Sequence, residues 1–227
     1  PSFHIAFNND YVEMHCYLNG YTLALQTSAK FRDYSAWYHV VCTLDSTQNT
    51  NTDRGAIYVN GVLQDYAATT WPSQNDNVLI NTNTSPCWIG RRNTSVTKLI
   101  DGYLADLHFI DGTALDPTSF AETNADTGQW VPIEYSGSHG TNGYHLKFDN
   151  TSDLGEDSST NGNDWTAGAN FETTVGFNLD PTSAPFTDID SGLTITNTGS
   201  TTTATAPTNS FNLTTVGTFD GSSQWLN

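Results

Sequence analysis

Basic residues are scarce in this sequence. Only 7 of its 227 residues are lysine or arginine, against 24 aspartates and glutamates, and the formal net charge is −17. Such a field repels nucleic-acid phosphates and anionic lipid surfaces, so we expect neither a nucleic-acid partner nor membrane insertion. A lysine-poor acidic surface suits salty water outside a cell, where ions screen self-repulsion, although simple solubility explains it equally well.

Cysteines and long apolar runs are also few. Cys16, Cys42 and Cys87 form no C-x-x-C pair, which argues against a structural zinc site, and their odd number argues against a disulfide framework. Their apolar neighbours predict buried free thiols. No stretch approaches the roughly 20 apolar residues of a membrane-spanning helix, and no signal peptide is visible.

The sequence lacks any sustained helical period. Instead, short alternating apolar runs are separated by turn signals, which predicts an all-β antiparallel fold. Asn19-Gly20 separates the runs 11–17 and 21–26, and Asn60-Gly61 separates 56–59 from 62–64. Asn-Gly between two such runs is the strongest short-range signal for a β-hairpin, so we expect two hairpins here.

Further elements follow along the chain. We expect strands at 37–44, 87–90 and 143–148, two apolar runs within 99–110, and a long polar connection over 66–86. Asp116-Pro117 predicts a single helical turn, with Asp116 as its N-cap and Pro117 in the first helical position.

Three segments resemble the signature strands of laminin-G-like domains: WYHVV at 37–41, IYVNG at 57–61 and DGYLADL at 101–107. They occur in the order and at the spacing of that family. The resemblance implies an antiparallel two-sheet β-sandwich, a jelly roll of the concanavalin-A-like kind. Its expected core residues are Trp37, Val41, Ile57, Val59, Ile89, Leu104, Leu107 and Phe109.

A narrower resemblance covers about residues 30–170. Segments 108–148 and 149–167 look like a module common in large virion proteins of marine bacteriophages, and 206–215 (APTNSFNLTT) resembles the spacer that follows it. We therefore expect a sandwich over 1–178, whose first strands in such relatives lie upstream of Pro1. The Thr/Ser/Asn-rich residues 179–227 are expected to form an extended arm or the start of a following module.

The same resemblance implies a structural role on the virion surface, as part of a fibre, a spike or a decoration. The expected partners are other virion subunits, including copies of this chain, and a glycan of the host surface. The alternative is a secreted or cell-surface carbohydrate-binding lectin or adhesin of a marine bacterium, which would share this fold and composition.

Catalysis is not expected. The chain has five glutamates, none spaced with a second carboxylate as a glycosidase dyad requires, and it has no G-x-S-x-G or H-E-x-x-H motif. Glycoside hydrolysis is therefore the least favoured alternative. We expect His39 and His108 to be core or edge histidines rather than catalytic bases.

A carbohydrate site is suggested by Trp71 with Asn75, Asp76 and Asn77, because this tryptophan lies in a polar loop. The equally weighted alternative is a tryptophan that folds back over the sandwich as the anchor of that loop.

Calcium is the one cofactor that the sequence suggests. Asp149, Asp153 and Asp157 are the candidate ligands, since carboxylate oxygens crowd this short loop and hard cations prefer oxygen. No glutamate closes the loop in the manner of an EF-hand. The favoured alternative is a series of Asx-turns without a metal.

Overall fold

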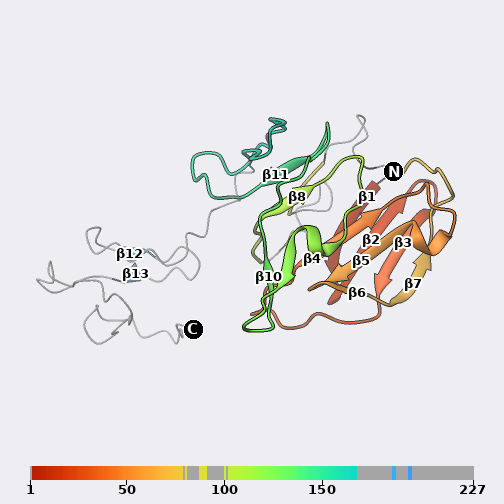
Figure 1. The fold of residues 1–227 in the computed structure, drawn as a ribbon, viewed down its shortest axis with the longest axis horizontal. Helices are drawn as coiled ribbons and strands as arrows, with labels where there is room; N and C mark the ends of the chain where they lie inside the picture. Colours follow the sequence, from red (N-terminus) through yellow and green to blue (C-terminus); the bar gives the residue numbers. More distant parts are fainter. Residues whose placement is uncertain are drawn as a thin grey trace, which may run out of the picture. The chain divides into compact units, whose positions relative to one another are not determined.

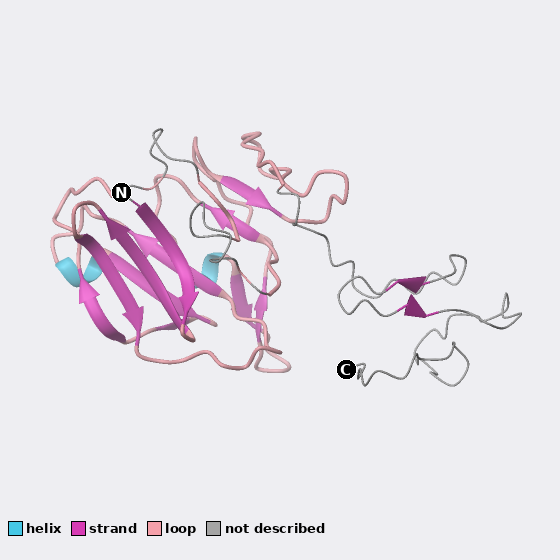
Figure 2. Ribbon diagram, turned by 180° about the vertical axis from the view of Figure 1, so that it is seen from behind, coloured by secondary structure: helices cyan, strands magenta, loops and turns pink. Residues whose placement is uncertain are grey.

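The structure, a computed structural model, describes residues 2–78, 80, 87–90, 100, 102–167, 186–187 and 194–195. The chain divides into two compact units, Pro1–Thr166 and Ala167–Asn227. Figures 1 and 2 show that the described part of the first unit consists of strands and loops, with only two short helical turns. The expected all-β class is therefore confirmed.

The largest sheet, here called sheet A, has four antiparallel strands in the order β1-β2-β3-β7. These strands are β1 (Ser2–Asn8), β2 (Tyr11–Tyr17), β3 (Tyr21–Thr27) and β7 (Tyr66–Thr70). The predicted hairpin at Asn19-Gly20 is confirmed, and Asn19 adopts a φ of 56°, the left-handed conformation that asparagine tolerates.

Two strands of sheet A were not predicted. β1 joins β2 through Asn9-Asp10, which adopt φ angles of 50° and 71°, a left-handed pair suited to a tight hairpin. β7 corrects the prediction of a long polar connection over 66–86, because the first five residues of that segment form a strand. Four of its five residues are exposed, and it lies at the edge of the sheet. An edge strand of this kind does not need the apolar alternation by which strands are predicted from sequence.

A second sheet, here called sheet B, has three antiparallel strands in the order β4-β5-β6. Its strands are β4 (Val40–Leu44), β5 (Gly55–Val59) and β6 (Val62–Leu63), and the 3₁₀ turn η1 (Asn51–Asp53) lies between β4 and β5. The predicted Asn60-Gly61 hairpin is confirmed, with φ angles of 49° and 79° at the turn. β4 is shorter than the predicted strand 37–44, because 37–39 are irregular.

The core lies between sheets A and B. Alternate residues of β2 and β3 point to one face, as the period of a strand requires. They pack against β5, which makes the two sheets the layers of a sandwich. The buried cluster consists of Val12, Met14, Cys16, Leu23, Leu25, Ile57 and Val59.

Two small antiparallel pairs complete the described part of the first unit: β8 (Leu107–Phe109) with β11 (Tyr144–Leu146), and β9 (Ala121–Thr123) with β10 (Trp130–Pro132). The predicted helical turn is confirmed as η2 (Pro117–Ser119), where the Asp116 carboxylate accepts a hydrogen bond from Thr118 N at 2.8 Å. In the second unit, β12 (Phe186–Thr187) pairs with β13 (Thr194–Ile195); the rest of the predicted arm lies outside the described residues.

The predicted core is correct only in part. Ile57 and Val59 are buried, and Val41, Ile89, Leu104, Leu107 and Phe109 are half-buried. Trp37 is 66% exposed, so its assignment to the core was wrong. It lies in the irregular segment before β4, where strand alternation no longer determines whether a side chain points into the core or to solvent. The predicted strand 87–90 is also wrong, since these residues are irregular.

The cysteines also differ from the prediction of three buried thiols. Cys16 is buried and Cys42 is half-buried, but Cys87 is exposed; all three are free. Burial raises the pKa of Cys42 to about 12, so its thiol stays protonated and inert at neutral pH. Among the described residues, no helix is both long and apolar enough to cross a membrane.

Candidate functional site

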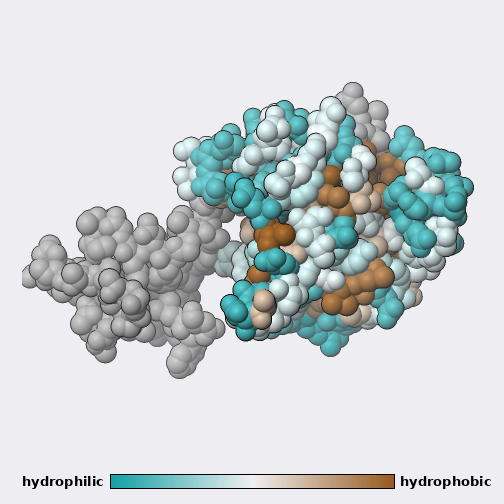
Figure 3. Space-filling model, in the orientation of Figure 1, coloured by the Kyte–Doolittle hydropathy of each residue, from teal (hydrophilic) through white to brown (hydrophobic). Residues whose placement is uncertain are grey.

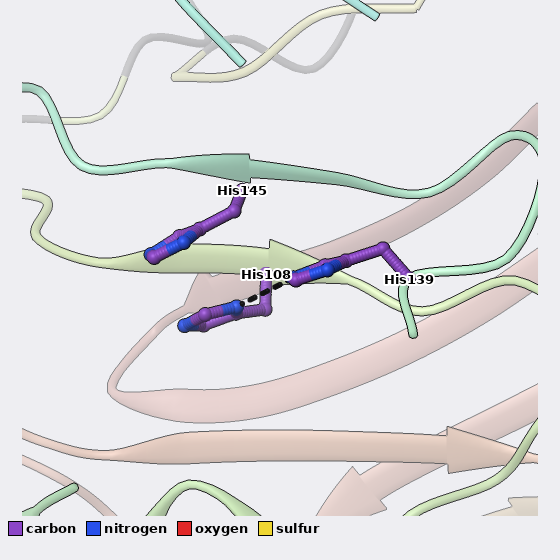
Figure 4. Close-up of side chains that lie close together, drawn as sticks. All are labelled: His108, His139 and His145. Atoms are coloured by element: carbon purple, nitrogen blue, oxygen red, sulfur yellow. Dashed lines mark hydrogen bonds between the residues drawn. The ribbon is translucent and has the colours of Figure 1, made fainter. Parts of the chain in front are cut away.

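Three histidines gather where β8 and β11 pair. His108 of β8 lies directly opposite His145 of β11 in the antiparallel register, so both side chains stand on the same face. Their ring centroids are 3.8 Å apart, with planes inclined by 21°. Figure 4 shows these two rings together with His139, which reaches them from the loop before β11.

His139 extends the cluster through a hydrogen bond. Its Nε2 lies 3.1 Å from Nδ1 of His108, and the two ring planes differ by 15°. The backbone holds His139 in place, because its carbonyl accepts a hydrogen bond from Asp111 N at 2.9 Å. Gly140 follows with a φ of +73°, and a Cβ there would collide with the Asp111 carbonyl. The close approach of these two segments therefore requires glycine.

Asp106 supplies the negative charge of the cluster. Its Oδ1 lies 2.5 Å from His145 Nε2 and 3.5 Å from His108 Nε2. Burial by itself would raise the pKa of Asp106, but the hydrogen bonds and charges of the two histidines hold that pKa below its usual value. The carboxylate therefore remains ionised and acts as an acceptor.

His108 and His139 resist protonation. Burial, followed by repulsion from His145, lowers the pKa of His108 to about 4, despite the attraction of Asp106. Burial also lowers the pKa of His139. His108 and His139 are therefore neutral at pH 7, and they offer hydrogen-bond donors and acceptors rather than positive charge.

An open depression of about 280 Å³ adjoins this cluster. Its wall combines aromatic, acidic and basic side chains with a short apolar stretch. The lining residues are Asp106, His108, Pro132, Ile133, Glu134, Tyr135, His145 and Lys147. A concave surface with a few converging polar groups and one aromatic ring is able to hold a polar small molecule.

The ring geometry does not favour a metal in this cluster. Each of the three histidines offers a nitrogen, and these atoms lie within 4.8 Å of one another. However, the ring planes differ by only 11° to 21°. Imidazole lone pairs lie in the ring plane, so the stacked rings of His108 and His145 direct theirs along separate layers, and Nδ1 of His108 is already engaged with Nε2 of His139. The cluster is built for hydrogen bonding. A second close group, His4, Glu13 and His15, lies in sheet A.

A pair of exposed aromatic side chains lies elsewhere on the sandwich unit. Trp37 is 66% exposed and Tyr103 is 60% exposed. Their ring centroids are 6.3 Å apart, with planes inclined by 47°. Figure 3 shows that the visible face is mainly hydrophilic, with small separate hydrophobic patches. Two large neighbouring rings that are each more than half exposed offer apolar faces on which a ligand could stack.

The loop predicted to bind carbohydrate is folded onto the sandwich at its start. Trp71 packs against the core cluster and contacts Tyr66 edge to face, with centroids 5.7 Å apart. Asn75 and Asn77 are exposed and Asp76 is half-buried. The Trp71 ring therefore packs on the sandwich and does not form an exposed aromatic surface beside Asn75, Asp76 and Asn77. Their carbohydrate role stays a prediction.

The three aspartates predicted to bind calcium have different surroundings. Asp149 and Asp153 are exposed, whereas Asp157 is buried. The Asp157 carboxylate accepts hydrogen bonds from the backbone N–H groups of His145, Ser159 and Asn163 and from the Ser159 hydroxyl. These three aspartates belong to neither close ligand group found among the described residues. Calcium binding stays a prediction.

Sequence reasoning did not single out the histidine cluster. His108 and His145 are far apart in the sequence, and neither belongs to a recognised motif. One usable signal was present, since two apolar strand segments (LHF and YHL) each place a histidine at the centre. If these strands pair in register, the two histidines must face each other.

Comparison with known proteins identifies the sandwich region. A family model described as concanavalin A-like lectin/glucanases superfamily matches residues 2–121. This range contains Trp37, Tyr103, Asp106 and His108. No curated protein and no solved structure gave a match.

Proposed function

Because the chain belongs to the concanavalin A-like lectin/glucanases superfamily, we propose that it is a non-catalytic module that adheres to glycans. The observation that carries this proposal is the pair of Trp37 and Tyr103, which are 66% and 60% exposed within the matched region. The apolar faces of sugar rings stack on aromatic side chains, and such rings cost little conformational entropy when they bind.

The depression beside the histidine cluster supports the same function. Tyr135, Glu134 and Lys147 line it together with the neutral His108. These groups supply the donors and acceptors that sugar hydroxyls need. Tyr103 and Asp106 belong to one short loop segment, so the same loop contributes to both surfaces.

The absence of catalysis is part of the proposal. Asp106 and Glu134 both line the depression, which is the arrangement to examine for a glycosidase. A general acid needs a raised pKa, but the histidines lower that of Asp106. We expect no release of reducing ends from laminarin, agarose or alginate. Turnover that Asp106→Asn or Glu134→Gln abolishes would contradict this part of the proposal.

We place the module on the surface of a virion, as part of a fibre, spike or decoration. This placement rests on the resemblance of residues 108–167 to phage virion modules. If this placement is right, the protein should be found in purified virus particles, and residues 1–227 should form an oligomer in light scattering. A secreted bacterial lectin is the alternative, and a stable monomer absent from purified particles would favour it.

The glycan proposal is tested by binding to an array of marine and bacterial surface polysaccharides. Trp37→Ala and Tyr103→Ala should each weaken retention by about tenfold, or about 1.4 kcal/mol. Tyr34→Ala is the matched control, since Tyr34 is 89% exposed but bonded to Asp10 rather than paired with Trp37. Equal binding by all three variants, or no glycan bound at all, would refute the proposal.

A further inference from the structure

His4, Glu13 and His15 form a compact group on sheet A. His4 of β1 lies directly opposite His15 of β2 in the antiparallel register. Glu13 precedes His15 by two positions in the same strand, so both point to one face. This face is opposite to the one that carries Val12 and Met14 into the core. Three potential ligands therefore stand together on the outer face of a regular two-strand segment.

The distances between the three ligand atoms are those of a metal site. Glu13 Oε1 lies 3.2 Å from His4 Nε2 and 3.9 Å from His15 Nδ1, and all three atoms lie within 4.8 Å of one another. For bonds of about 2.1 Å in a tetrahedral zinc centre, adjacent ligand atoms are roughly 3.4 Å apart. A contraction of the group to these separations would bring all three atoms onto one ion.

The ring orientation also permits a shared ion. The His4 and His15 planes are inclined by 78°, with centroids 5.1 Å apart. In-plane lone pairs of nearly perpendicular rings are able to converge on one point, unlike those of the stacked rings at His108. The two clusters thus contain similar residues, but of the two only the one in sheet A has ring planes inclined steeply enough for in-plane lone pairs to converge.

The carboxylate is buried and held in position. Glu13 is 2% exposed, while the side chains of His4 and His15 are 9% and 13% exposed. Its second oxygen, Oε2, accepts a hydrogen bond from Asn8 Nδ2 at 3.1 Å. Such a bond from an outer residue fixes the orientation of a ligating carboxylate. Burying a charge is costly unless partners or a metal compensate it.

We propose that His4, Glu13 and His15 bind one divalent transition-metal ion, with zinc as the first candidate and water completing the coordination. Two imidazoles and one carboxylate suit zinc and ferrous iron, whereas calcium and magnesium prefer all-oxygen sites. The ion would join β1 to β2 and thereby stabilise the edge strand of sheet A. This site is separate from the residues of the proposed glycan surface.

The test starts from protein stripped with a chelator and dialysed. Zinc should bind at one equivalent per chain, with a micromolar or lower Kd in calorimetry, and raise the Tm, while calcium and magnesium should not. His4→Asn and Glu13→Gln should each lose at least tenfold in affinity. His139→Asn is the control for the other cluster and should bind zinc like the parent chain.

Variants that do not fold would also fail to bind, so the unaltered chain provides a second readout. In NMR spectra, zinc should shift the imidazole resonances of His4 and His15 and leave those of His139 in place. No zinc binding by the stripped protein would overturn the proposal. So would binding that His4→Asn and Glu13→Gln leave unchanged, or shifts confined to His139.

Discussion

Replacing Asp157 with alanine should destabilise the loop that holds β11. The carboxylate is buried and accepts four hydrogen bonds, three from backbone N–H groups and one from the Ser159 hydroxyl. The loop also docks through the Ser158 N–H, which donates to the His145 carbonyl at 2.8 Å. Asp157 therefore connects the 149–164 loop to the strand that carries His145.

The magnitude follows from the groups left without an acceptor. Each buried donor that loses its partner costs about 1–3 kcal/mol, and relaxation of the loop makes the costs less than additive, so we expect about 3–5 kcal/mol in total. Asp157→Asn retains one acceptor oxygen but turns an amide N–H₂ toward donors, so its cost should be smaller. Asp153→Ala is the matched control, because this residue is exposed and its carboxylate accepts one bond, from Gly155 N at 3.1 Å.

Urea unfolding followed by tryptophan fluorescence measures the effect. Trp165 directly follows this loop, with its ring centroid 5.1 Å from that of Tyr144 and its backbone N–H donating to the Gly155 carbonyl. It therefore reports directly on docking of the loop. If Asp157→Ala unfolds within about 0.5 kcal/mol of Asp153→Ala, a difference typical of surface changes, the hydrogen bonds do not carry the stability assigned to them.

The pH dependence gives a second check on Asp157. Burial by itself would raise its pKa, but the hydrogen bonds from His145, Ser159 and Asn163 lower it below the usual value. Its contribution is thus present above the unfolded-state pKa of about 3.9 and is lost as the pH falls through the folded-state value. The stability difference between the parent chain and Asp157→Asn should therefore shrink in acid.

Three further changes have defined outcomes. Gly61→Ala should cost more than Gly112→Ala in thermal unfolding, because both glycines have positive φ but only a Cβ at Gly61 would meet the Trp130 ring, at 2.9 Å; equal costs would show that the ring yields freely. Leu25→Ala, in the buried core, should cost about 2–5 kcal/mol in urea unfolding with an unchanged m-value, and a cost below about 1 kcal/mol would contradict close packing there. Burial and His145 lower the pKa of His108 to about 4, so the unfolded chain, with a histidine pKa of about 6.5, binds the proton first. Stability should therefore fall between pH 6.5 and 4, and His108→Gln should flatten this fall; an unchanged slope would assign it to other groups.

Local chemistry made several elements predictable from the sequence. Asn-Gly forms a left-handed turn between alternating runs, and both predicted hairpins occur where that pair stands. Asp116 caps its helical turn through its own side chain. These features involve residues adjacent in the chain, so no distant partner is needed to specify them.

Edge strands were harder to predict, because their residues are not required to alternate. β7 contains mainly exposed alanine and threonine, and it becomes a strand only through pairing with β3. The sequence also could not determine which large aromatic side chains are exposed, because strand alternation does not apply to residues in or near loops. Trp37 and Trp71 both stand near polar loops, yet one opens to solvent and the other packs on Tyr66.

The sequence by itself determined the all-β class, the two Asn-Gly hairpins and the capped turn, because these depend on side-chain period and on conformations of neighbouring residues. The tertiary structure alone decided which distant side chains meet. His108 faces His145 through strand register, and His4 faces His15 in the same way. Strand pairing is set by burial of whole faces across the sheet, and the spacing of single histidines does not encode it.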